Sequence, residues 1–597
     1  MNPPDGPPSR ADAAGRREYL SLLLGTGTTL IAGCTADSTD KSGDADDSGS
    51  RTNGPSKGEQ PYPIDRSVRF QASNPYVSPS YYNWNPFAVG FPEDRFGIFA
   101  QWTQYLVAED RFHPHLIQDW THSDGEFVLT ISEKFAWSKT GEDVTAGDLA
   151  FQLSVYDAAN HVATRFVDDA QATDEFELTI SYPAELNAEL VEYTVLPLLA
   201  DIPPSNWEDA AWEDDPTTVQ VEDPDASGPL ALAEVGNNST TTRVRDGLED
   251  FADHNLAANY NWGGYEILYV SSEWRPFDVD GTDGVIAPEA SPGPHDEAPD
   301  TIEEIEIPSD QGLALWFNHD QEPWTDRVVR KAFLHTIDPK TAIDDGLGSI
   351  PAQSHPAPTG LTSPAREEWL GANRPEGFSA YDGGAARGEE LLAEAGYEPG
   401  DLDITIAYSG RRSGWASVCL ELIEQLQSAG WTVEGSNFSG SPRDGFEGDF
   451  DVVAASYTPS HRLPREGVYI HHPFFPLEYI FSGDPHSNEH FAKYDPGVVT
   501  VDGSDIDVSS ELETLRTTSE RADQRPVVQR LARVINHDVP CGIIMDDVDR
   551  SFIDTEQFTI PDDSTHLHCH WPQWWLPKVD EKLPDAERDG LMKYRGG

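Results

Sequence analysis

Residues 401–438 read DLDITIAYSGRRSGWASVCLELIEQLQSAGWTVEGSNF. The apolar side chains recur first at every second position and then at every third or fourth, which predicts a strand followed by an amphipathic helix. The strand positions are Leu402, Ile404, Ile406 and Tyr408, and the helix positions are Trp415, Cys419, Leu422 and Leu426. A second strand begins at Trp431. Strand, helix and strand in this order form a βαβ unit, so we expect an α/β fold with a parallel component in its sheet.

The flanking sequence continues this alternation of helices and strands. Thr145 and Asp148 have the spacing of a capping box, which predicts the start of one helix. Pro526 suits the first position of another helix, where its missing N–H group would have no partner in any case. We expect helices over 145–156, 326–337, 382–395 and 526–535, strands over 450–455 and 541–545, and acidic loops rich in Pro and Gly over 207–228 and 278–300.

The chain of 597 residues is strongly acidic, with 105 Asp and Glu against 40 Lys and Arg and a formal net charge of −65. Such a surface is repelled by a phosphate backbone, which argues against a nucleic-acid partner. Hydrophobic residues make up 38% of the chain, enough to build packed cores, so global disorder is not expected. Because molar salt screens the self-repulsion, the composition resembles that of proteins from extreme halophiles. An ordinary acidic secreted protein is the alternative.

The N-terminus resembles an export signal. A twin-arginine pair that begins at Arg16 precedes the apolar run Leu20–Ala32, which is too short to span a bilayer comfortably. The run leads into Cys34 in a context that resembles a lipobox, where the cysteine becomes the lipidated first mature residue. We therefore expect a twin-arginine lipoprotein signal over 1–33 and a disordered acidic spacer over 34–66, rather than a buried N-terminal helix. The body would then stand on the outer face of the cytoplasmic membrane.

The remaining cysteines are few and unpatterned, so no disulfide framework is expected. Cys419 falls on the apolar face of its helix and is expected in the core. Residues 566–570 read HLHCH, and His566, His568 and His570 would share one face of a strand. No second Cys or His cluster at zinc-site spacing accompanies them. A polar strand or loop edge is therefore the favoured interpretation, and the three histidines are weak metal candidates.

Common enzyme signatures are absent from the sequence. It contains no Gly-x-x-x-x-Gly-Lys-Ser/Thr phosphate loop, no His-Glu-x-x-His and no Gly-x-Ser-x-Gly. Paired carboxylates are so frequent in this chain that they carry no information on glycosidase chemistry. We therefore expect a binding protein with no catalytic residues and no cofactor.

Several short segments resemble, in the same order, those of the extracellular solute-binding proteins of family 5, the peptide-type receptors of ABC importers. The order of the segments, together with a haloarchaeal type of twin-arginine lipoprotein signal, indicates this family more strongly than any one segment. The segments are Asn85–Phe87, Asp119–Trp120, Phe127–Ile131, Phe135–Ser138, Val144–Phe151, Ser227–Leu230, Leu315–Asn318, Asp326–Phe333, Leu391–Tyr397 and Gly448–Asp451.

The resemblance implies a two-lobed α/β clamp of the periplasmic-binding-protein-like type II fold, with an additional domain inserted in lobe I. Lobe I would comprise 67–306, including an inserted subdomain at about 95–205, and lobe II would comprise 307–545. Residues 546–597 would return to lobe I and form the C-terminal tail. The chain would cross between the lobes near 306 and 546, which would form the hinge that closes over a ligand.

An interlobe cleft uses aromatic walls and a few fixed polar groups, so the candidate ligand-binding residues are Trp84, Asn85, Trp415, Tyr457 and His461. By resemblance, peptide-binding members carry an Asp shortly after the aromatic residue at the position of Tyr457, and it pairs with the peptide amine. Residues 456–461 contain no Asp. A peptide, an oligosaccharide and a metal chelate are therefore all possible ligands.

The resemblance implies a lipid-anchored, monomeric receptor that delivers a peptide or a similar small polar solute to an ABC permease and ATPase complex. Two alternatives remain at this point. One is a membrane-anchored extracellular hydrolase on an unrelated α/β fold. The other is a sensory or surface receptor that uses the clamp without transport.

Overall fold

The structure is a computed structural model of the chain. It describes residues 68–73, 83–87, 95–106, 111–228, 230–236, 239–245, 265–270, 284–286, 301–348, 352–355, 357–371, 375–381, 383–410, 413–438, 450–458, 472–482, 494, 496–556, 558–559 and 593–594. The N-terminal signal, Cys34, His461 and the 566–570 histidines lie outside the described residues.

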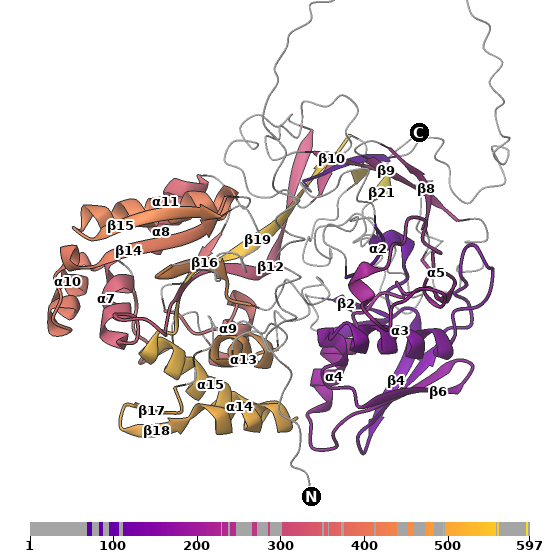
Figure 1. Cartoon of the computed structure of the whole chain (residues 1–597), viewed down its shortest axis with the longest axis horizontal. Helices are drawn as coiled ribbons and strands as arrows, with labels where there is room; N and C mark the ends of the chain where they lie inside the picture. The colour runs from indigo at the N-terminus through magenta and orange to yellow at the C-terminus, as the bar shows by residue number, and fades with distance from the viewer. Residues whose placement is uncertain are drawn as a thin grey trace, which may run out of the picture. The chain divides into compact units, whose positions relative to one another are not determined.

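A mixed sheet of 11 strands is the largest element among the described residues, with the order β15-β14-β16-β12-β19-β11-β1-β10-β9-β8 and with β13 paired to β19 beside this path. Its two longest strands, β12 (Ile302–Phe317) and β19 (Cys541–Asp554), pair in antiparallel fashion and lie side by side in Figure 1. The shorter strands are β1 (Val68–Ser73), β8 (Leu230–Val235), β9 (Ser239–Val244), β10 (Tyr265–Val270), β11 (Gly284–Ile286), β13 (Gln353–Ser354) and β16 (Val452–Ser456).

The unit predicted from residues 401–438 is confirmed. Strand β14 (Asp403–Ser409) leads through helix α11 (Ser413–Ser428) to strand β15 (Thr432–Phe438), and the two strands pair in parallel. The predicted helix face is buried in one apolar cluster, through Trp415, Cys419, Leu422 and Leu426. Removing these side chains from water is what holds α11 on the sheet.

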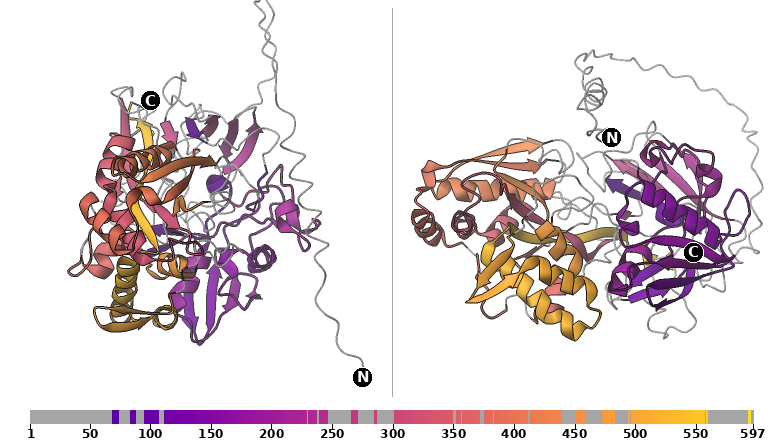
Figure 2. Two further views of the ribbon diagram at one scale, coloured as in Figure 1. Left: turned by 60° about the vertical axis from the view of Figure 1, so that its left-hand side comes forward. Right: turned by 60° about the horizontal axis from the view of Figure 1, so that its bottom comes forward.

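A separate four-stranded sheet has the order β4 (Ile117–Ser123), β5 (Glu126–Ile131), β7 (Glu177–Ser181) and β6 (Asp169–Asp174). Helix α3 (Ala146–Ala158) packs against β6 and β7, and Figure 2 shows it across this sheet. The predicted capping box at its start is present, because Thr145 and Asp148 each accept a hydrogen bond from the other's backbone N–H.

The helices expected at 326–337 and 382–395 are present as α7 (Arg327–Thr336) and α10 (Ala385–Glu394). The remaining helices are α2 (Arg95–Ile98), α4 (Ala188–Val195), α5 (Pro204–Trp207), α8 (Pro339–Leu347), α9 (Ser363–Leu370), α13 (Phe474–Ser482), α14 (Val508–Thr517) and α15 (Arg521–Asp538), with short 3-10 turns at Val162–Thr164, Pro216–Thr218 and Pro399–Asp401. The remaining strands form pairs, β2 (Thr103–Leu106) with β3 (Arg111–Pro114), β17 (Val498–Val501) with β18 (Ser504–Asp507), and β20 (Phe558–Thr559) with β21 (Lys593–Tyr594).

Two local predictions are wrong. Helix α15 begins at Arg521, so Pro526 lies inside it and not at its first position. A proline there forfeits one backbone hydrogen bond, but the turns that follow bury Val527, Val528 and Leu531, which favours the longer helix. The loop expected over 278–300 contains β11, a three-residue strand too short to show a period of two.

The loop expected over 207–228 has no strand and only one short 3-10 turn, as predicted. Among the residues that the structure describes, no helix combines the length and the apolar composition that a membrane span needs.

Candidate ligand-binding site

The two long strands lose their regular pairing near the middle of β12. The register between β12 and β19 shifts between Pro308 and Gly312. A Cβ atom at Gly312 would come within 2.3 Å of the carbonyl oxygen of Met545 and 2.5 Å of Cε1 of Tyr457. Only glycine therefore fits here, and its absent side chain lets the Tyr457 ring pack against the β12 backbone beside Asp546.

The carboxylate of Asp546 is the acceptor of a buried hydrogen-bond network. Its Oδ1 accepts from the hydroxyl of Tyr457, which follows β16, and from Nε2 of His355, which follows β13, at 2.6 Å. Its Oδ2 accepts from the Ser363 backbone N–H at 2.9 Å, from the Ser363 hydroxyl, and from Nη2 of Arg366 at 3.3 Å. Three segments that are far apart in sequence, 355–366, Tyr457 and β19, therefore meet at one carboxylate.

Electrostatics fix the protonation states in this network. Burial alone would raise the pKa of Asp546, but its contacts with His355, Arg366 and Ser363 lower the pKa to about 2. Burial lowers the pKa of His355 despite the adjacent carboxylate. Burial and the same carboxylate raise the pKa of Tyr457. At neutral pH the network thus holds an ionised carboxylate, a neutral imidazole that donates through Nε2, and a neutral phenol.

The next residue of β19 carries a second carboxylate. Both oxygens of Asp547 lie 2.9 Å from Nε1 of Trp415, near the start of α11. Tyr457 and Trp415, two of the sequence candidates, are therefore held by neighbouring acids of one strand. The two rings are buried in different apolar clusters, as expected for partners of adjacent strand residues, whose side chains point to opposite faces of a sheet.

Three buried polar atoms beside the Asp546 network have no hydrogen-bond partner among the described residues. They are Nε and Nη1 of Arg366 and Nδ1 of His355. Both residues are 1% exposed. Buried polar atoms are nearly always paired in folded proteins. These three atoms are exceptions to that rule within the Asp546 network.

Trp84 and Asn85 are buried in a different set of contacts. The Asn85 side-chain amide donates to the carbonyl oxygens of Pro216 at 2.8 Å and Val219 at 2.9 Å, and its Oδ1 accepts from the Phe87 N–H at 2.8 Å. These bonds attach the 83–87 segment to the 216–219 turn. The indole N–H of Trp84 has no hydrogen-bond partner among the described residues.

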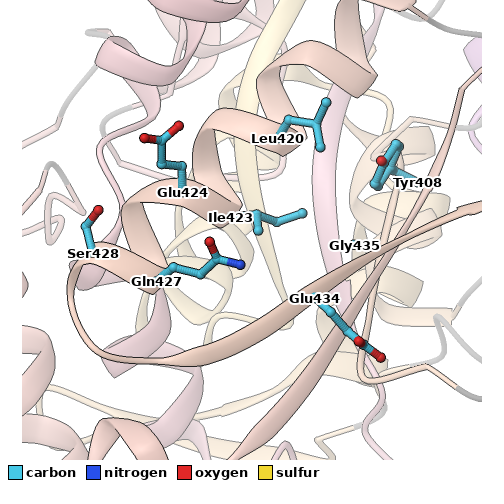
Figure 3. Close-up of a pocket in the computed structure, with 8 residues that line it drawn as sticks. All are labelled: Tyr408, Leu420, Ile423, Glu424, Gln427, Ser428, Glu434 and Gly435. Atoms are coloured by element: carbon cyan, nitrogen blue, oxygen red, sulfur yellow. The ribbon is translucent and has the colours of Figure 1, made fainter.

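A pocket of about 740 Å³ opens elsewhere, between α11 and strands β14 and β15. Figure 3 shows Ile423 and Gln427 of α11 directed toward β15, with Gly435 opposite. None of the sequence candidates lines it, and it carries the acidic side chains Glu424 and Glu434.

The model of the family described as "Bacterial extracellular solute-binding proteins, family 5 Middle" matches residues 111–471, more than half of the chain. The chain belongs to this family. No curated protein matches the sequence significantly. The predicted resemblance to family 5 is therefore confirmed over the middle of the chain.

Three solved structures share the fold. A mannohexaose-bound oligopeptide-binding protein of an ABC transporter from Thermotoga maritima superposes with a TM-score of 0.67 and 16% identity, over 89% of this chain and 100% of that one. The oligopeptide-binding protein AppA from Bacillus subtilis, in complex with a nonapeptide, gives 0.64 and 13%, over 89% and 99%. NikZ from Campylobacter jejuni, in complex with Ni(L-His), gives 0.62 and 14%, over 84% and 97%. The predicted fold class, a periplasmic-binding-protein-like type II α/β clamp, is confirmed.

The structure of this family 5 member distributes the described sequence candidates over different contacts. Trp415 and Tyr457 meet the adjacent acids of β19, whereas Trp84 and Asn85 contact the 216–221 segment. Among the described residues, no group of three or more His, Cys, Asp or Glu side chains is arranged to hold a metal ion.

Sequence reasoning missed the residues that organise the network, namely Asp546, Asp547, His355, Ser363 and Arg366. Their partners lie far apart in sequence, 191 residues for His355 and Asp546, so no local pattern reveals them. The one available signal was the acidic pair at the end of an apolar strand. This signal could not be recognised, because the chain has acids at most of its turns.

Proposed function

We propose that the protein is the substrate-binding receptor of an ABC importer, which captures a peptide or a similar small polar solute and presents it to a permease and ATPase complex. The observation that carries the proposal is the polar network at Asp546 on a family 5 fold. It gathers fixed polar groups at the shift between β12 and β19. A few fixed polar groups of this kind can orient a small solute.

The proposed domain division follows the family clamp. Lobe I comprises 67–306 with an inserted subdomain at about 95–205, lobe II comprises 307–545, and 546–597 returns to lobe I. Two features support it. The four-stranded sheet of the inserted subdomain is separate from the large sheet. The register shift of β12 and β19 lies close to the expected crossings, where a hinge needs backbone that is not locked in regular pairing.

In this division the inserted subdomain already touches lobe II. The N–H of Asn187, at the start of α4, donates to the carbonyl oxygen of Arg516 on α14 at 2.8 Å. Arg165 pairs with Glu478 on α13. Contacts of this kind hold a clamp closed over its solute, and a solute that binds the closed form shifts the population toward it.

The receptor is proposed to be exported by the twin-arginine route and to act as a monomer anchored by a lipid on Cys34 at the outer face of the cytoplasmic membrane. Replacing Cys34 with Ser should release the body into the medium, and replacing Arg16 and Arg17 with Lys should leave it in the cytoplasm. The net charge of −65 supports a saline environment for the body. A body that unfolds equally readily in dilute buffer and in molar salt would contradict that environment.

Thermal unfolding of the body in molar salt tests the receptor function. Panels of peptides, oligosaccharides and metal chelates are added, because a solute that binds only the folded state raises the unfolding temperature as its concentration rises. We expect one panel to stabilise the protein, with a fall in radius of gyration in solution scattering as the lobes close. Trp415→Phe should weaken this stabilisation, whereas Trp212→Phe, in the contact with Phe151, should not. No stabilisation by any panel would contradict the proposal.

A further inference from the structure

Residues 437–439 read NFS, which is an Asn-x-Ser acceptor sequence for an N-linked glycan. The sequence contains two more acceptors of this kind, at Asn237 and Asn238, and both asparagines lie outside the described residues. Such a short pattern also arises by chance, so the place of Asn437 in the fold decides what it means. Because the twin-arginine route carries folded proteins, a transferase at the outer face would meet Asn437 in the folded chain.

Asn437 is an exposed residue near the end of β15, the strand at one end of the 11-stranded sheet. The next residue, Phe438, is partly buried against the largest apolar cluster. Successive side chains of a strand point to opposite faces, so Asn437 points away from this cluster. It is in register with Tyr408 of the parallel strand β14 and shares a face of the sheet with it.

The side-chain amide of Asn437 is held in one orientation. Its Oδ1 accepts a hydrogen bond from the Gly410 N–H at 2.8 Å, while its Nδ2 donates to no group among the described residues. A Cβ atom at Gly410 would come within 2.4 Å of this Nδ2, so the glycine leaves space beside the nitrogen. A glycan replaces one hydrogen of Nδ2 and leaves Oδ1 an acceptor, so the bond to Gly410 is compatible with the modification.

The pocket between α11 and β15 extends along the same face of the sheet. Gly435, two residues before Asn437 in β15, lines it, and so do Tyr408 and the 51% exposed side chain of Leu420 (Figure 3). The polar side chains that line it are Glu424, Gln427, Ser428 and Glu434. Sugar rings offer apolar C–H faces and many hydroxyl donors, so an aromatic ring, an aliphatic side chain and several oxygen acceptors suit them.

We propose that Asn437 carries an N-linked glycan whose first sugars lie in the pocket between α11 and β15. The inference rests on the proposed export of the receptor to the outer face of the membrane. The co-substrate is an oligosaccharide held on a lipid phosphate. Nδ2 of Asn437 forms a bond to C1 of the first sugar, the bond between C1 and the phosphate oxygen breaks, and the lipid phosphate leaves with the proton that Nδ2 loses.

The glycan would protect an open edge of the sheet. Strand β15 pairs with β14 and with no other strand among the described residues. An edge strand presents unpaired N–H and C=O groups to which another chain can add, and proteins commonly cover or charge such edges. A bulky hydrophilic group at Asn437 hinders this addition.

Mass spectrometry of the full chain tests the modification. The protein is produced from its own gene in its own cells, isolated from their membranes and digested, and the peptide that contains Asn437 is weighed. We expect added sugar mass on Asn437, and its complete loss in Asn437→Gln and in Ser439→Ala, since both remove the acceptor sequence. Ser439→Thr should keep the added mass. Ser436→Ala, an exposed change beside the acceptor sequence, is the matched control.

Oxidation of side chains by hydroxyl radicals tests the position of the sugars. The wild-type protein is compared with Ser439→Ala, which lacks the glycan but keeps Asn437. Leu420 and Tyr408 should lose much of their oxidation in the wild type, because the sugars cover them. Val498 of β17, which is 60% exposed and does not line the pocket, should be oxidised equally in both proteins.

Each outcome decides one part of the proposal. An unmodified Asn437 would overturn it, whether or not Asn237 and Asn238 carry glycans. A modified Asn437 with equal oxidation of Leu420 and Tyr408 in the two proteins would overturn the position of the sugars in the pocket. The receptor function fails separately, if no solute stabilises the same preparations against thermal unfolding.

Discussion

Arg165 and Glu478 form a bidentate ion pair, with Nη1 of the guanidinium 2.5 Å from one carboxylate oxygen and Nη2 bound to the other. The side chains are 18% and 14% exposed, so solvent screens the pair only in part. The guanidinium also lies over the rings of Phe166 and Phe474, at 4.9 Å and 5.8 Å from their centroids. In the proposed domain division this pair connects the inserted subdomain with lobe II.

The first prediction concerns this pair. Arg165→Met and Glu478→Gln should each lower the free energy of unfolding by about 1–3 kcal/mol, because the remaining partner stays partly buried without its counter-charge. If the pair holds the clamp closed, each variant should also speed ligand dissociation and leave association nearly unchanged.

A double-mutant cycle measures the coupling between Arg165 and Glu478. The control is Lys340 and Asp344, an exposed i,i+4 pair with side chains 72% and 59% exposed, where we expect a coupling near zero. Equal coupling in both cycles would show that the Arg165 pair has no special role in closure.

The second prediction concerns Gly312. Gly312→Ala should destabilise the protein by about 1–3 kcal/mol or more, since the new methyl group would collide with the Met545 carbonyl oxygen and the Tyr457 ring. Gly147→Ala, in the first turn of α3, is the control, because its nearest neighbour lies 3.5 Å from the new atom. Chemical denaturation of both variants should separate them clearly, and similar midpoints would contradict the tight packing at the β12 shift.

Local signals in the sequence predicted the elements whose pattern is complete within a few residues. The strand and helix of residues 401–438 follow from periodicity, and the start of α3 follows from Thr145 and Asp148. The helix start predicted at Pro526 was wrong. The preference of proline for the first turn of a helix contributes less free energy than the burial of the turns around it. The site was least predictable, because Asp546 acquires its partners only when distant segments meet.

The third prediction concerns Asp201, which accepts a hydrogen bond from the Tyr156 hydroxyl at 2.7 Å. Burial raises the pKa of Asp201 to about 6, although the contacts with Tyr156 and Arg95 oppose the rise. The folded state therefore binds this proton more tightly than the unfolded state. Its effect on stability is absent below about pH 4, and the cost of ionisation grows as pH rises from about 4 to about 6.

Asp201→Asn should remove this cost and raise the free energy of unfolding at pH 7 by up to about 3 kcal/mol, the equivalent of roughly two pKa units. The gain should vanish at pH 4, where the wild-type carboxyl is protonated in the folded state. Denaturation at a series of pH values measures it, with Glu389→Gln on the surface of α10 as an acid-to-amide control. A gain that is the same at pH 4 and pH 7 would refute the assignment to ionisation.

The fourth prediction separates a structural role from a binding role within the 83–87 segment. Asn85→Ala should cost about 2–4 kcal/mol, because it breaks the bonds to Pro216 and Val219 and leaves buried backbone groups unpaired. Trp84→Phe should change stability less, because the indole N–H that it removes has no hydrogen-bond partner among the described residues.

If Trp84 contacts the solute, Trp84→Phe should weaken solute binding by about tenfold while the protein stays folded, since one hydrogen bond and part of the aromatic surface are lost. Thermal unfolding with and without solute measures both quantities in the same samples. Trp207→Phe provides the matched control, because its buried indole N–H likewise has no partner among the described residues and its ring packs at 6.1 Å from that of Phe87. Equal losses of affinity in the two variants would assign Trp84 to the core of the segment and remove it from the ligand site.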